Sequence, residues 1–173
     1  SNTYTLNTAY GSGIVAKGTG ILMNNEMDDF SIKPGTPNAY GLVGSEANKI
    51  ESRKSPLSSM SPTVVFKNSK PVLITGSQGG SMIINTVFQE ILNVLEFEMK
   101  LSESNKKERV HYQWKPDILF HEGLSKDLIE ELSREMRLYE RKIGETQSIA
   151  LENDEYKGWT DYRRPDGKKI ELH

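Results

Sequence analysis

The chain has 173 residues, with 22 Lys and Arg against 24 Asp and Glu, which gives a net charge of −2. This length suffices for one domain with a hydrophobic core, and the near-neutral charge gives no electrostatic reason to expect nucleic acid as a partner. The chain has no cysteine, which excludes disulfides, thiolate metal sites and a cysteine nucleophile. It also lacks the run of about 18 apolar residues that a membrane-spanning helix needs.

The N-terminal third of the chain is rich in loops. Residues 3–8 favour a strand because Thr, Tyr and Leu dominate them, and residues 21–23 favour a short buried strand. Pro, Gly, Ser and Asn then fill residues 33–56. Because a loop this long inside a compact domain is usually functional, we expect part of a binding site there.

The middle of the chain alternates between apolar runs and turns. Residues 63–66 and 72–75 are apolar runs separated by Asn68-Ser69-Lys70, a pattern that predicts a β-hairpin. A long helix is expected from about 81 to 99, since apolar residues recur there at i, i+3, i+4 and i+7. The apolar stripe is wide, which predicts that the helix is largely buried.

The C-terminal part is predicted to contain two further helices and two strands. A short polar helix fits 101–108, residues 111–120 favour extended structure, and Ser125 is a suitable N-cap for a helix to about residue 136. Strands fit 146–151 and 155–160, and the charged tail from Arg163 is expected to be loose. The order of strands, helices and strands predicts a single α/β (α+β) domain with a mainly antiparallel sheet.

One candidate site is the glycine turn, residues 76–80 (G-S-Q-G-G), between a predicted strand and a predicted helix. Glycines let a backbone approach a ligand, and the N–H groups at a helix start can hold a phosphate or an oxyanion. A tight strand-to-helix turn explains the same residues equally well. The spacing matches neither a P-loop nor a dinucleotide fingerprint.

Two other groups of polar residues could bind the charged ends of an amino acid. Ser58, Ser59 and Ser61 can donate hydroxyl hydrogen bonds to a carboxylate, although a hydroxyl-rich turn is the more common explanation. Glu26, Asp28 and Asp29 could bind an ammonium group, or form the start of a helix or a solvated turn. The three histidines have no metal-like spacing, so we expect neither a metal nor another cofactor.

Taken together, these segments resemble the small, C-terminal subunit of the γ-glutamyltranspeptidases in order and spacing. The likeness covers nearly the whole chain and is strongest over 3–100. It continues through 108–114, 146–149 and 161–164. Its most specific motifs are T-Y-T-L-N at 3–7, L-M-N-N-E-M-D-D-F at 22–30, K-P-G-x-P-N-x-Y-G-L-V-G at 33–44, P-L-S-S-M-S-P-T at 56–63 and T-G-S-Q-G-G-S at 75–81.

The resemblance implies an αββα four-layer sandwich of the N-terminal-nucleophile hydrolase type, of which this chain supplies the small-subunit half. It also implies a precursor that cleaves itself into two subunits, so the large subunit of the same precursor is the expected partner. The first Thr of the small subunit would attack the γ-carbonyl of glutathione or another γ-glutamyl compound. Water, an amino acid or a peptide would then accept the γ-glutamyl group, in the periplasm or outside the cell.

The resemblance also assigns roles to individual residues. Thr5 would hydrogen-bond the nucleophilic hydroxyl, and the Gly79 and Gly80 amides would form the oxyanion hole. The substrate's α-amino end would be held by Asn7, Glu26 and Asp29. Its α-carboxylate would be bound by Ser58 and Ser59, and Tyr40 would belong to a lid over the pocket.

Some features depart from the family pattern. The nucleophilic Thr would lie upstream of Ser1, so we expect the chain alone to be inactive and its lid, residues 33–44, to be displaced. Gln78 stands where the family usually has Pro, which is expected to loosen the oxyanion hole. The alternative functions are a poly-γ-glutamate or β-lactam side-chain acylase and, for the chain alone, a catalytically inactive association module. The intact lid favours a γ-glutamyl substrate, because a short lid suits a polymer better.

Overall fold

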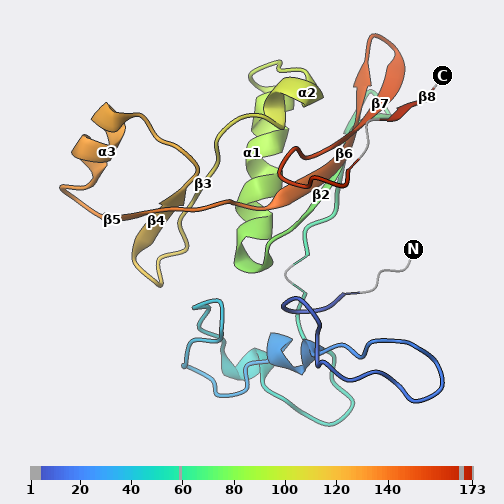
Figure 1. Ribbon diagram of the computed structural model, residues 1–173, viewed down its shortest axis with the longest axis vertical. Coiled ribbons are helices and arrows are strands. Elements are labelled where there is room, and N and C mark those ends of the chain that lie inside the picture. The colour runs from blue at the N-terminus through green and yellow to red at the C-terminus, as the bar shows by residue number, and fades with distance from the viewer. Residues whose placement is uncertain (1–4, 59, 168–169, 173) are drawn as a thin grey trace. The chain divides into compact units, whose positions relative to one another are not determined.

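The computed structural model describes residues 5–58, 60–167 and 170–172 (Figure 1). The chain divides into two compact units, Ser1–Ser58 and Ser59–His173, which are described in turn. The expectation of a single domain stays a prediction. No helix in the described residues is both long and apolar enough to cross a membrane.

The first unit consists of loops around two short 3₁₀ helices, η1 (Glu26–Asp29) and η2 (Glu46–Asn48). The strand expected over 3–8 is wrong for the described residues 5–8, which form loop and turn, while residues 3 and 4 lie outside the described part. The buried strand expected over 21–23 is also wrong. Leu22 makes only an isolated bridge to Val15, and the flanking Ile21 and Met23 are exposed.

The second unit is built on a five-stranded sheet of order β1-β2-β6-β7-β8. Its strands are β1 (Thr63–Lys67), β2 (Lys70–Gln78), β6 (Glu145–Glu152), β7 (Glu155–Thr160) and β8 (Ile170–Leu172), and every pairing is antiparallel. The predicted hairpin is confirmed, with Asn68 and Ser69 at positive φ in its turn. The two predicted C-terminal strands are confirmed as β6 and β7.

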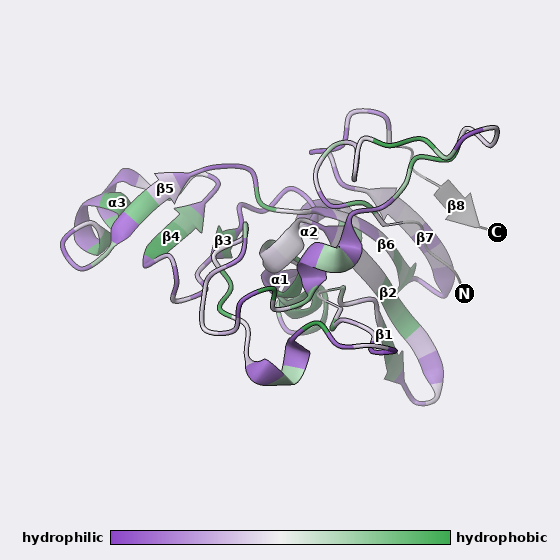
Figure 2. Cartoon of the chain, turned by 90° about the horizontal axis from the view of Figure 1, so that it is seen from below, coloured by the Kyte–Doolittle hydropathy of each residue, from purple (hydrophilic) through white to green (hydrophobic). Residues whose placement is uncertain are grey.

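The long predicted helix is confirmed as α1 (Ile83–Leu95), which lies against β2 and β6 (Figure 1). The apolar core beside it is formed by Leu73 of β2, Ala150 of β6 and Leu101, which follows α1 in the chain. Ile91 and Val94 of α1 pack against this core. Strands β1 and β4 carry mostly apolar residues (Figure 2).

The buried face of α1 agrees only in part with the predicted apolar stripe, in which Ile83 and Val87 are buried as expected. Ile84 and Phe88 are 59% and 55% exposed, so the helix is only partly buried within this chain. Two further buried residues were not predicted, and both are polar: Thr86 and Glu90. The polar pair is tolerated because hydrogen bonds to the sheet and to the helix backbone satisfy it.

A second sheet has the order β3-β4-β5, formed by β3 (Val110–His111), β4 (Ile118–His121) and β5 (Arg137–Glu140). Two short helices are found in this part of the chain. α2 (Leu101–Ser104) precedes β3, and α3 (Lys126–Leu132) lies between β4 and β5. The Ser125 cap is confirmed, since its Oγ accepts a hydrogen bond from Leu128 N at 3.3 Å. The helix ends four residues earlier than expected, and β5, parallel to β4, follows it.

The expectation of a loose charged tail is wrong at its first residue. Arg163 is only 6% exposed, because its guanidinium pairs with two buried carboxylates, Asp161 at 3.0 Å and Glu122. Arg109 pairs with the other oxygen of Asp161 at 2.7 Å. Burial alone would raise the pKa of Asp161, but Arg109 and hydrogen bonds from Arg163 and Thr146 hold it below its ordinary value.

Candidate active site

In the first unit, the acidic turn η1 and the loop before it form one hydrogen-bonded cluster. Asn7 Nδ2 donates to Asp29 Oδ1 at 3.1 Å, and Asn7 N donates to Asn25 Oδ1 at 2.9 Å. The 3₁₀ helix therefore carries Asp29 to the side chain of Asn7, although 21 residues separate them in the chain. An amide and a carboxylate so joined leave acceptor oxygens that can take an ammonium group.

Glu26 adds a second carboxylate to this cluster, and its environment disfavours the charged form. Its Oε1 is buried and has no hydrogen-bond partner among the described residues. Burial raises the pKa of Glu26 above its ordinary 4.5, and the hydrogen bond and negative charge of Asp29 raise it further. A buried carboxylate oxygen without a hydrogen-bond partner is costly, so a cation arriving here would find Glu26 Oε1 open as an acceptor.

Tyr40 closes the cluster from the lid. Its hydroxyl donates to Asn7 Oδ1 at 3.2 Å, so the expectation that the lid is displaced from Asn7 is wrong. The lid folds on itself, because Gly35 N donates to Gly44 O at 2.8 Å and Asn38 Oδ1 accepts from Tyr40 N and Leu42 N. Burial and the three nearby carboxylates raise the pKa of Tyr40, which keeps its hydroxyl protonated as a donor.

Asn48, which sequence reasoning missed, connects η1 to the serine segment. Its Nδ2 donates to Asp29 O at 2.8 Å, and its Oδ1 accepts from Leu57 N at 3.0 Å. One side chain thus links the backbone of Asp29 to the residue before Ser58. The only signal in the sequence is an Asn in a loop already rich in turn residues.

Thr5 and Ser58 are the other described residues of the first unit that were predicted to belong to the site. Thr5 is half-buried two residues before Asn7, and Ser58 is exposed at the end of the unit. Ser59 lies outside the described residues. The structure therefore brings together Asn7, Glu26, Asp29 and Tyr40, and it places Ser58 one residue beyond the backbone that Asn48 holds.

The glycine turn belongs to the second unit, where it joins β2 to α1. Gly79 and Gly80 have φ of 139° and 57°, and only glycine adopts the first of these without strain. Met82 N donates to Gly79 O at 3.1 Å. The turn is followed by the short 3₁₀ helix η3 (Gly80–Met82) and then by α1.

Gln78 is anchored by the strand next to it. It pairs with Glu145 in the β2–β6 ladder, and its side-chain amide donates to the Glu145 carboxylate. The expected loosening at this position is therefore offset by a hydrogen bond that a proline could not make.

His111 and His121 occupy structural positions. His111 is buried, with its ring nitrogens 3.1 Å from Asn85 Oδ1 and 2.8 Å from Gln113 Oε1. His121 Nδ1 accepts from Leu124 N at 3.4 Å, and His173 lies outside the described residues. Over the described ranges, no group of three or more His, Asp or Glu side chains is arranged to hold a metal ion.

Comparison with known proteins gives consistent results. Residues 1–170 match the family model described as gamma-glutamyltranspeptidase. The glutathione hydrolase proenzyme of Escherichia coli K12 is 50% identical over 169 residues, covering 95% of this chain and 29% of that protein. The proenzyme of Bacillus subtilis is 35% identical, covering 95% of this chain and 27% of that protein. The chain thus spans less than a third of the length of the curated relatives it matches.

Solved structures give the same result. The T380A mutant of Helicobacter pylori gamma-glutamyltranspeptidase is 47% identical, with a TM-score of 0.88, and the match covers 94% of this chain and 92% of that one. The Pseudomonas nitroreducens enzyme complexed with L-DON is 39% identical, with a TM-score of 0.90 and coverage of 98% and 91%. These matches confirm the expected α+β class and the N-terminal-nucleophile hydrolase fold. The chain belongs to the γ-glutamyltranspeptidase family.

Proposed function

We propose that the complete protein transfers the γ-glutamyl group of glutathione and related compounds to water, or to amino acids and peptides. The observation that carries this proposal is the cluster of Asn7, Glu26, Asp29 and Tyr40. It offers carboxylate oxygens, among them the unpaired Glu26 Oε1, and the Asn7 amide to the α-amino end of a γ-glutamyl donor. The names of the relatives, which are glutathione hydrolase proenzymes, support the same activity.

The reaction would use a nucleophile and a partner subunit. The nucleophile would be the hydroxyl of an N-terminal Thr of the small subunit, near Thr5. The large subunit from the same precursor would complete the pocket. Location in the periplasm or outside the cell is part of the same proposal.

The roles of the individual residues follow from the chemistry of the substrate. Glu26 and Asp29 hold the ammonium group, Asn7 orients Asp29, and Ser58 and Ser59 donate hydroxyl hydrogen bonds to the α-carboxylate. In the second unit, the amides of Gly79 and Gly80 stabilise the oxyanion of the tetrahedral intermediate. Tyr40 retains the substrate by closing the lid over Asn7.

The lid favours a small γ-glutamyl compound over the polymer or β-lactam alternatives. Its base is closed by the Gly35 N–Gly44 O hydrogen bond at 2.8 Å, and Tyr40 reaches Asn7. A lid closed in this way suits a free amino-acid head group better than a chain that must pass through the site.

The test is the release of a chromogenic γ-glutamyl anilide by the complete precursor after its maturation. We expect turnover with the matured protein and none with the present chain alone. An N-acetylated γ-glutamyl anilide, which lacks the ammonium, is the matched control and should lose at least tenfold in kcat/KM, because a charge-assisted hydrogen bond contributes about 1.5–3 kcal/mol. Absence of turnover in the matured protein would exclude this function.

A further inference from the structure

The glycine turn is not free-standing, because the start of β6 packs directly against it. A Cβ built on Gly79 would lie 3.3 Å from Gly144 Cα and 3.7 Å from Gly144 N. Gly144 comes just before Glu145, the first residue of β6. The Gly144 backbone therefore fills the space beside Gly79, and the place of one residue limits the place of the other.

Gly144 itself has no room for a side chain. Its φ is +62°, and a Cβ there would lie 2.3 Å from Thr86 Oγ1 and 2.9 Å from Ser77 Oγ. Thr86 is fully buried, and its Oγ1 donates to Met82 O at 2.9 Å. Turning Thr86 away would bury an unpaired hydroxyl, which costs about 1–3 kcal/mol, so the strain would be relieved by moving Gly144 instead.

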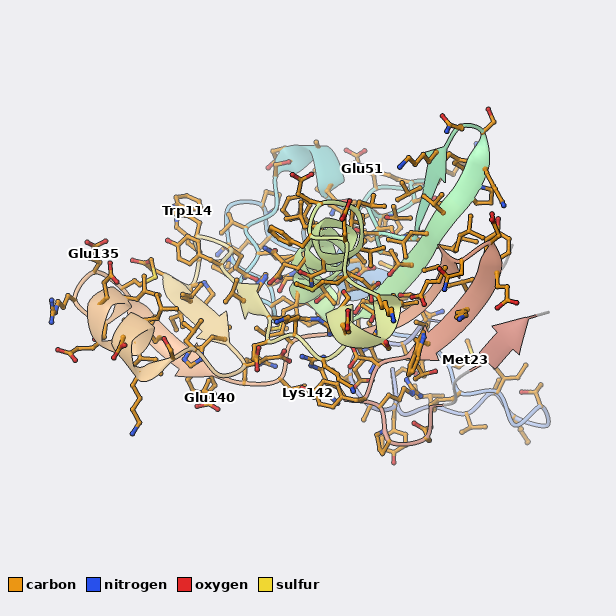
Figure 3. All side chains as sticks on the ribbon, turned by 90° about the horizontal axis from the view of Figure 1, so that it is seen from above. Met23, Glu51, Trp114, Glu135, Glu140 and Lys142 are labelled. Carbon is orange, nitrogen blue, oxygen red and sulfur yellow. The ribbon has the colours of Figure 1, made fainter. Side chains whose placement is uncertain are left out.

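Hydrogen bonds tie the same segment to the turn from the other side. Glu145 N donates to Ser77 Oγ at 3.0 Å, and Ser77 Oγ donates to Gln78 O at 2.7 Å. The Glu145 carboxylate accepts from the Gln78 amide and from Lys142, which lies on the segment between β5 and β6 (Figure 3). The carbonyl that precedes Gly79 is thus held by a chain of contacts that begins at β6.

We propose that Gly144, together with Ser77, is a positioning residue for the oxyanion hole, setting where the Gly79 and Gly80 amides point. This inference rests on the proposed function of the turn. An oxyanion hole works through donors placed at about 2.7–3.1 Å from the developing charge. A methyl group at Gly144 shifts the backbone that touches Gly79, and the amides then point away from that charge.

The test uses the complete, matured protein and the Gly144→Ala variant. Losing one oxyanion donor costs about 10²–10³ in kcat, so displacing the donors is expected to cost about tenfold to hundredfold. The inhibition constant for L-glutamate depends on binding of the amino-acid head group alone, so it should stay within about twofold of the parent value. Turnover is normalised to the sites labelled by a covalent γ-glutamyl-directed inhibitor, so that misfolded protein does not lower kcat.

Gly13→Ala is the matched control for backbone strain. Gly13 has φ of +70°, close to that of Gly144, but a Cβ there meets nothing within 4 Å. The kcat of the Gly13→Ala variant, taken for each labelled site, should equal that of the parent protein. A second comparison adds Thr86→Ala to Gly144→Ala, because this removes Thr86 Oγ1 and Cγ2, the two atoms nearest to the new methyl group, and leaves Ser77 Oγ at 2.9 Å. The double variant should recover part of the lost kcat, whereas purely additive losses would exclude the steric mechanism.

The outcomes separate this inference from the proposed function. No turnover by the parent protein defeats the function, whatever the variants do. With an active parent, a normal kcat in Gly144→Ala, or equal losses in kcat and glutamate affinity, overturns the positioning role. If Gly144→Ala fails to mature, Ser77→Ala, which adds no atoms, decides the question through the same two measurements.

Discussion

The Tyr40 hydroxyl lies 3.2 Å from Asn7 Oδ1, so the lid and the residue that orients Asp29 share a hydrogen bond. The Asn7 side chain donates a hydrogen bond from its NH₂ group to Asp29 and accepts one from Tyr40 at its oxygen. This arrangement is formed by residues of the first unit.

Tyr40→Phe should weaken substrate binding more than turnover. The variant loses one donor to Asn7, and a neutral hydrogen bond contributes about 0.5–1.5 kcal/mol, so KM should rise roughly two- to twelvefold. Steady-state kinetics of the complete protein measure the effect. Tyr10→Phe, at a side chain that is 71% exposed, is the control and should change nothing. Equal behaviour of the two variants would remove Tyr40 from the pocket.

Asp29→Asn should cost far more than Asp28→Asn. Asp29 accepts from Asn7 and is proposed to hold the ammonium group, whereas Asp28 has no assigned contact with substrate. Losing a charge-assisted bond of about 1.5–3 kcal/mol lowers kcat/KM roughly ten- to hundredfold, mostly through KM. A solvated acidic turn would instead give small and similar losses for both variants.

Acid should weaken substrate binding through Glu26. The pKa of this carboxyl is raised by burial and by Asp29, and only the charged form attracts an ammonium. KM should therefore rise as pH falls through the raised pKa, that is, at a pH above the ordinary 4.5. In Glu26→Gln this dependence should vanish. A pH profile of KM that is unchanged by the substitution would show that another group titrates.

Glu26→Gln should also change the thermal stability of the protein, in a direction that depends on pH. A raised pKa in the folded state means that folding favours the protonated form, so Glu26 destabilises the protein at a pH above its folded pKa. Glu26→Gln should therefore raise Tm near neutral pH and leave it unchanged in acid. Thermal unfolding at the two pH values measures this, and a lower Tm at neutral pH would contradict it.

Asn48→Asp should weaken substrate binding indirectly, by releasing the backbone of Asp29. The variant keeps an oxygen for Leu57 N but loses the donor to Asp29 O. A lost hydrogen bond of about 1 kcal/mol raises KM roughly fivefold. Asn24→Asp controls for the added charge, because the Asn24 side chain only accepts a bond, from Glu26 N at 3.1 Å. Similar effects in both variants would assign the loss to charge alone.

Arg163→Met should destabilise the fold strongly. It strips the guanidinium from Asp161 and Glu122, and removing one partner of a buried ion pair costs about 3–5 kcal/mol. Arg164→Met is the control, since Arg164 pairs only with Glu145 at 3.8 Å and Asp166 at 3.2 Å, at 44% side-chain exposure. Denaturant unfolding of the two variants should differ by most of that amount, and equal midpoints would refute the network's importance.

Local patterns in the chain were enough to predict several elements. The hairpin of β1 and β2, the existence of α1, the Ser125 cap and the pair of β6 and β7 all follow from apolar periodicity and turn residues. These patterns extend over a few neighbouring residues, so they can be interpreted without knowing which other segments pack against the element. The family resemblance, rather than any local pattern, marked Asn7, Asp29 and Tyr40, which the structure brings together.

Other features depended on partners distant in the chain. The buried face of α1 includes Glu90 in place of an apolar side chain, because hydroxyls on β2 and β6 donate hydrogen bonds to its carboxylate. Arg163 is buried because Glu122 and Asp161 neutralise it, and Asn48 matters because it reaches both Asp29 and Leu57. Burying a polar group is favourable only when a partner satisfies it, and that partner is chosen by the tertiary fold.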